Sequence, residues 1–91
     1  MIFKIKKVKK RDGKIVDFSP DRIRLAIKKA MLSCGPLKNG MLDKIHEEVL
    51  RIMERKYPDD KEIPSVEDIQ DIVEFVFIKF DMYEVAKKFI I

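Results

Sequence analysis

Apolar and charged residues alternate along residues 2–10. This period of two predicts a β-strand, because successive side chains of a strand point to opposite faces. The alternation slips at Val8, where a bulge would shift the outward face. Asp12-Gly13 follows and is typical of a two-residue type I′ turn, which needs positive φ angles. A return strand over 14–18 completes an N-terminal β-hairpin, so that the hairpin spans residues 2–18.

Beyond the hairpin the apolar spacing becomes helical, which predicts four helices within residues 20–91. Ser19-Pro20 marks the first start, with a hydroxyl to cap free amides and proline at the first helical position. Ser65 marks the third start and Asp81 the fourth. The side chains expected to face the core are Ile23, Ala26, Ile27, Ala30, Met31, Cys34, Leu42, Ile45, Val49, Ile52, Met53, Ile69, Ile72, Val73, Val76, Phe77, Phe80, Ala86, Phe89 and Ile90.

Between the second and third helices, Glu62-Ile63-Pro64 is expected to form a short extended link, because the residue before a proline prefers extended geometry. This link is a candidate third strand beside the hairpin. The predicted fold class is therefore α+β, with an N-terminal β-hairpin capping a four-helix bundle.

The 91 residues are interpreted as one domain, residues 1–91. Hydrophobic residues make up 46% of the chain, which favours one compact core over disorder. A deep catalytic cleft between two lobes is not expected at this length. Cys34 is the only cysteine, which excludes an internal disulfide. No apolar run approaches the ~20 residues of a membrane helix, so a reduced, cytoplasmic setting without membrane contact is expected.

Positive charge is concentrated at the N-terminus. Residues 1–14 hold seven Lys or Arg and one Asp, a local +6 within a total of +4, so residues 15–91 carry −2. Such a patch on a nearly neutral body indicates a small anionic ligand or nucleic acid. Lysines that guard an exposed sheet edge explain the same pattern equally well.

Motifs of common enzyme sites are missing, since the chain has no GxxxxGK[ST], GxGxxG or HExxH. His46 has no second ligand at metal-binding spacing and is interpreted as a surface or half-buried helical residue. Cys34 is interpreted as a packing residue rather than a nucleophile. We therefore expect no catalytic residue, no metal site and no enzyme activity from this chain.

The hairpin turn is the candidate for ligand chemistry. It presents Lys10 and Arg11 beside Gly13, whose bare backbone allows close approach of a ligand. Arginine offers a fork for phosphate oxygens and lysine a mobile point charge. The next helix, capped by Ser19, would add its positive dipole end and free amides. Together these features indicate a triphosphate site.

The chain resembles the ATP-cone family from near its start to its last residue. The resemblance lies in three sequence blocks that follow one another in this order: VKKRDGKIVDFSPDRIRLAIKKA, IPSVEDIQDIVE and YEVAKKFI. ATP-cones are regulatory domains of ribonucleotide reductases and of the repressor of reductase genes. The resemblance implies a four-helix bundle capped by a small mixed sheet. It also implies ATP or dATP as an allosteric ligand, with Mg²⁺ accompanying the nucleotide. The implied partner is a second copy, in a homo-oligomer, or a catalytic protein.

The resemblance also implies a set of nucleotide-contacting residues. Lys10 and Arg11 would meet phosphates, and Val8 and Val16 would pack on adenine. At two positions of the third helix the family's reductases have a hydroxyl and a histidine, where this chain has Val66 and Gln70. The full set is Val8, Lys10, Arg11, Gly13, Val16, Ser19, Arg22, Val66 and Gln70.

Two alternatives remain open at this point. A cone that has lost its ligand and serves as a dimerisation module fits the two departures on the third helix. A nucleic-acid binder fits the basic hairpin, although Phe3 is the only aromatic residue in its charged part, which leaves little for base stacking. The family's last helix usually continues to a Tyr-Arg pair, and the chain stops at Ile91, just short of it. It is therefore either a domain that works without that pair or a piece of a longer reductase-related protein.

Overall fold

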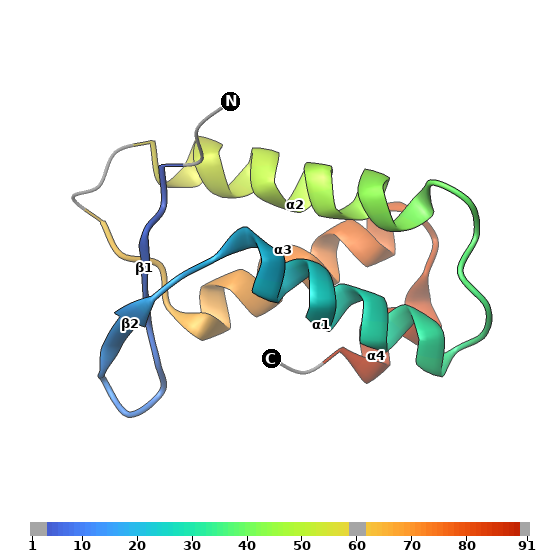
Figure 1. The fold of residues 1–91 in the computed structure, drawn as a ribbon, viewed down its shortest axis with the longest axis horizontal. Coiled ribbons are helices and arrows are strands. Elements are labelled where there is room, and N and C mark those ends of the chain that lie inside the picture. Colours follow the sequence, from blue (N-terminus) through green and yellow to red (C-terminus); the bar gives the residue numbers. More distant parts are fainter. Residues whose placement is uncertain (1–3, 59–61, 90–91) are drawn as a thin grey trace.

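The computed structural model describes residues 4–58 and 62–89. A two-stranded hairpin lies at one end of four helices, which confirms the predicted α+β class (Figure 1). The elements, in chain order, are β1 (Lys7–Lys9), β2 (Ile15–Asp17), α1 (Pro20–Ser33), α2 (Met41–Lys56), α3 (Val66–Lys79) and α4 (Tyr83–Lys88).

The helices form a closed ring of contacts. α1 packs on α2, α2 on α3, α3 on α4, and α4 returns to α1. Fully buried side chains from the long helices fill the centre, and Phe89 meets Phe77 edge-on with ring centroids 5.9 Å apart. In the described part of the chain no helix is long and apolar enough to cross a membrane.

Within the described residues the first strand starts later than predicted, because residues 4–6 lie outside β1, and the turn differs. Residues 2 and 3 of the predicted strand lie outside the described residues. The antiparallel register pairs Val8 with Val16, and the backbone of Lys10 and Lys14 continues it with an N···O distance of 2.8 Å. The loop therefore has three residues, with Gly13 at φ 88° and its amide donating to the Lys10 carbonyl at 2.9 Å. Asp12 has no positive φ, so the predicted type I′ turn is wrong. A type I turn followed by a left-handed glycine replaces it.

No bulge occurs at Val8, because its pairing with Val16 is regular. The alternation of buried and exposed side chains instead slips before β1, where Lys6 and Lys7 are both exposed between the buried residues Ile5 and Val8. The candidate third strand is reduced to a single parallel bridge between Lys9 and Ser65. The Lys9 amide donates to the Pro64 carbonyl at 3.0 Å, which ties the hairpin to the start of α3.

The predicted starts of α1 and α3 are confirmed. The Ser19 hydroxyl accepts a hydrogen bond from the Asp21 amide at 3.3 Å, and Pro20 is the first helical residue. At α3, Ser65 and Asp68 form a reciprocal capping box, with each side chain accepting from the other residue's backbone amide. The Asp68 carboxyl has its pKa lowered, first by the Ser65 amide that donates to it.

Two predictions at helix ends are wrong. Cys34 is exposed, because α1 ends at Ser33 and Cys34 is its C-terminal cap, beyond the buried stripe. Asp81 does not cap α4. It is the left-handed residue after the C-terminal cap of α3, Phe80, with a φ of 61° and its own amide donating to the Ile78 carbonyl at 3.0 Å. Met82 precedes α4 without a side-chain cap. Ile90, expected to face the core, lies outside the described residues.

Candidate functional site

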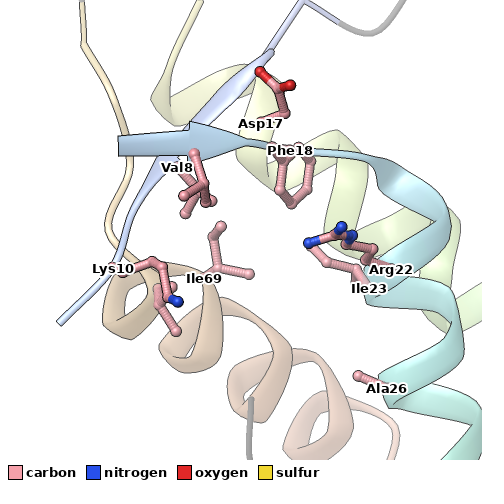
Figure 2. Close-up of a pocket in the computed structure, with 10 residues that line it drawn as sticks. Val8, Lys10, Asp17, Phe18, Arg22, Ile23, Ala26 and Ile69 are labelled. Atoms are coloured by element: carbon pink, nitrogen blue, oxygen red, sulfur yellow. The ribbon is translucent and has the colours of Figure 1, made fainter. Parts of the chain in front are cut away.

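A cleft of about 490 Å³ opens between the hairpin, α1 and α3 (Figure 2). Its existence follows from the helix lengths. The contact ring joins α1 to α3 through α4, which has six residues and lies at the end of the bundle away from the hairpin (Figure 1). At the hairpin end, α1 and α3 are therefore left apart. The lining residues are Val8, Lys10, Val16, Asp17, Phe18, Arg22, Ile23, Ala26, Val66 and Ile69.

The floor of the cleft is apolar. Val8, Ile23 and Ile69 are at most 7% exposed, and Val16 and Val66 cover their edges as half-buried residues. Floor residues thus come from the hairpin, α1 and α3 and belong to the same cluster as the core. An apolar surface of this kind, with few polar groups at its edge, suits a flat ring system.

Two cations stand at the rim. Lys10 follows β1 and Arg22 lies in the first turn of α1, and Figure 2 shows them on opposite sides of the cleft. Both are exposed, and neither has a carboxylate within 4.0 Å among residues 4–58 and 62–89. Their charges are therefore available to an anion in the cleft.

The one carboxylate among the lining residues is turned away. Strand alternation places Val16 toward the cleft and Asp17 on the opposite face, and Figure 2 shows the Asp17 carboxylate directed outward. It pairs with Lys7 on β1, and the hydrogen bond from Lys7 is the main cause of the lowered pKa of Asp17. The side chains that face the cleft therefore leave it positive.

Arg11 lies beside the cleft rather than in it. A smaller hollow of about 350 Å³ is lined by Lys10, Arg11, Asp12 and Val66, so it shares Lys10 and Val66 with the cleft. The Arg11 side chain reaches α3, where its Nη2 donates to Gln70 Oε1 at 3.4 Å.

Of the nine predicted site residues, the structure brings five together in the cleft: Val8, Lys10, Val16, Arg22 and Val66. Arg11 is next to them. Gln70 is hydrogen-bonded to Arg11 and Glu74 and does not line the cleft. Gly13 supplies the positive φ of the hairpin turn. The Ser19 hydroxyl accepts a hydrogen bond from the Asp21 amide as the N-terminal cap of α1.

Sequence reasoning missed Asp17, Phe18, Ile23, Ala26 and Ile69 as lining residues. Ile23, Ala26 and Ile69 were predicted as core positions, because a helical stripe looks the same whether it meets another side chain or a hollow. The signal that could have found them is the shortness of the last helix, which leaves the stripes of α1 and α3 unmatched at one end.

His46 has a structural role in support of the site. Its Nε2 lies 2.9 Å from the Pro20 carbonyl, which it meets as a donor, and this bond holds the start of α1 on α2. Arg22 is two residues further along α1.

No group of three potential metal ligands occurs within the described residues.

Fold and cleft define a class of protein: a small α+β domain in which a basic hairpin and two helices surround an apolar-floored cleft. The family model of the ATP cone domain matches residues 6–91, and the chain therefore belongs to the ATP-cone family of nucleotide-sensing regulatory domains. It is also 44% identical over 92 residues to the vitamin B12-dependent ribonucleoside-diphosphate reductase of Thermoplasma acidophilum. That match covers 96% of this chain and spans 11% of the reductase.

Proposed function

We propose that the cleft binds ATP or dATP and that its occupancy regulates a partner. The observation that carries this proposal is the pairing of an apolar floor with two rim cations, Lys10 and Arg22, that have no carboxylate within 4.0 Å in the described part of the chain. A nucleotide offers the matching chemistry, an apolar ring at one end and a polyanion at the other.

In the proposed complex the adenine and the phosphates contact different parts of the cleft. The adenine packs on the aliphatic side chains of Val8, Val16 and Ile69. The phosphates lie toward Lys10 and Arg22, with Arg11 within reach along the adjoining hollow. Mg²⁺ accompanies the phosphates as their own counter-ion, because the Asp17 carboxylate is directed out of the cleft.

Regulation, rather than catalysis, is the role that fits this chain. The reductase relative is about nine times longer than the match, which leaves ample chain for a catalytic body of its own. We propose that this domain acts on such a body, or on a second copy of itself. By linkage, whichever partner responds to the nucleotide must change the nucleotide's affinity in turn.

Isothermal titration of the protein with ATP, dATP and GTP tests the proposal. Charge-assisted hydrogen bonds contribute about 1.5–3 kcal/mol each, so three of them plus adenine burial reach the ~8 kcal/mol of micromolar binding. We expect micromolar dissociation constants for the two adenine nucleotides and weaker binding of GTP, because guanine has more polar edge groups to desolvate on an apolar floor. Flat titrations with ATP and dATP would overturn the proposal.

A further inference from the structure

Arg11 is held on α3 by two contacts. Its Nε lies 3.6 Å from Glu67 Oε1, and its Nη2 donates to Gln70 Oε1 at 3.4 Å. Gln70 is itself anchored, because its Nε2 donates to Glu74 Oε1 at 3.1 Å. The Arg11 guanidinium is therefore already engaged, unlike the charges of Lys10 and Arg22.

The contact between Arg11 and Glu67 is long and solvent-exposed. The Arg11 and Glu67 side chains are 58% and 68% exposed, and 3.6 Å is long for a charged hydrogen bond. Exposed ion pairs of this kind contribute little to folding. A phosphate group, with more charge and a geometry that matches the guanidinium fork, is a stronger partner.

The position of the pair matters as much as its strength. The hollow that contains Arg11 shares Lys10 and Val66 with the cleft, so it continues the cleft toward α3. A phosphate chain that leaves the cleft past Lys10 enters this hollow and meets Arg11. Glu67 lies in the first turn of α3, next to Val66.

We propose that Glu67 is a built-in competitor for the phosphate tail of the ligand: it holds Arg11 in the empty domain, and the bound polyphosphate takes Arg11 from it. This inference rests on the proposed function and adds to it. Glu67 sets the affinity for the tail, and the first turn of α3 loses its link to the hairpin loop when the tail arrives. Occupancy is thereby read on α3.

The test is a double-mutant cycle on ATP affinity, measured by titration calorimetry. Glu67→Gln keeps the size of the side chain and removes the charge that opposes the ligand. We expect it to tighten ATP binding about two- to fivefold, the range that corresponds to an exposed ion pair. In the background of Arg11→Ala the same change should have no effect, because the competition acts through Arg11.

Asp71→Asn is the matched control. Asp71 is one turn further along α3 and also exposed, and no ion pair joins it to Arg11. It reports the general effect of removing one negative charge from this helix. AMP provides a second control, because its single phosphate does not reach Arg11, and Glu67→Gln should leave its affinity unchanged.

The outcomes separate the inference from the proposed function. If wild-type protein binds ATP but Glu67→Gln and Asp71→Asn change the affinity equally, the competitor role is wrong and the nucleotide site stands. An effect of Glu67→Gln that persists without Arg11 would contradict it in the same way. If wild-type protein does not bind ATP, the proposed function fails and the inference fails with it.

Discussion

Two arginines of α1, Arg22 and Arg24, differ in what they contact. Arg22 has no carboxylate within 4.0 Å in the described chain and faces the cleft. Arg24, two positions further on, binds Asp43 of α2 at 2.8 Å. The two side chains are alike in the sequence, and only the structure distinguishes the arginine that lines the cleft from the one that links two helices.

This difference predicts the effect of removing each side chain. Arg22→Ala should weaken ATP binding about 10- to 100-fold, the equivalent of one charge-assisted hydrogen bond, with little change in the free energy of unfolding. Arg24→Ala should leave the affinity unchanged. Titration calorimetry gives the affinities and urea unfolding the stabilities. Equal losses of affinity would mean that general charge, not the cleft, attracts the nucleotide.

Glu48 is the best-supported ion-pair residue of the helical bundle. Its side chain is 13% exposed and accepts from Lys79 of α3 at 2.7 Å and from Arg51 of its own helix at 2.8 Å. These bonds, Lys79 first, lower the pKa of the Glu48 carboxyl below its usual value. A lowered pKa in the folded state means that the stabilisation is present above the unfolded pKa and is lost as the pH falls through the folded one.

Glu48→Gln should therefore lower the free energy of unfolding at pH 7 by about 1 kcal/mol. The difference from wild type should shrink as the pH falls below the ordinary glutamate pKa and through the lowered pKa of the folded-state carboxyl, because the wild-type side chain is then protonated too. Urea unfolding between pH 3 and 7 checks both points. Glu84→Gln is the control, because Glu84 is 76% exposed and its pair with Lys87 is 3.7 Å long. A Glu48→Gln deficit that does not depend on pH would contradict this account.

At the scale of elements, the junction between the hairpin and α3 holds the site together. Lys9 bonds the Pro64 carbonyl, and the next residue, Ser65, caps α3. This junction brings Val66 into the cleft beside the hairpin. Ser65 therefore contributes both to the local stability of α3 and to the shape of the site.

Ser65→Ala removes the hydroxyl that accepts the Asp68 amide, and it should destabilise the domain by about 1 kcal/mol. Thermal unfolding followed by circular dichroism measures the loss. Ser33→Ala is the control, since the Ser33 hydroxyl donates to the Ala30 carbonyl one turn back and lies near Cys34 Sγ, and it caps no free amide. Equal changes in the two variants would show that the capping box is not what stabilises the start of α3.

Helix positions were predictable where a single local signal decides them. The hydroxyl of Ser65 followed by Asp68 marks the start of α3 whatever surrounds it. The prediction at Asp81 was wrong because aspartate serves both as a helix cap and in the left-handed conformation, and here it takes the left-handed conformation just after α3. Asp12-Gly13 misled for a related reason, since one positive φ at Gly13 suffices for a three-residue loop.

At the scale of the whole molecule, the site is a consequence of unequal helix lengths. α4 packs against both α1 and α3 at one end of the bundle, and the hairpin lies at the other end (Figure 1). The cleft is what remains between the hairpin and the two helices it covers. The hairpin, α1 and α3 all line the cleft, so the proposed ligand would link the hairpin to the bundle.

This arrangement also explains what the sequence could not predict of the site. Lys10 and Arg22, which the structure places at the rim of the cleft, were candidate site residues from the basic hairpin and from the resemblance to the family. Ile23 and Ile69 were predictable only as buried. That they form the floor of a cleft depends on the length and packing of α4 at the opposite end, and no pattern within α1 or α3 carries that information.

The most direct test of the central claim is to locate the bound nucleotide. At 10.8 kDa the protein is suited to NMR, and nuclear Overhauser effects between the adenine protons and ¹³C-labelled methyl groups report contacts within about 5 Å. We predict contacts from adenine to the methyls of Val8, Val16 and Ile69. Contacts confined to exposed methyls outside the cleft, such as those of Leu25 and Leu32 on α1, would contradict the account.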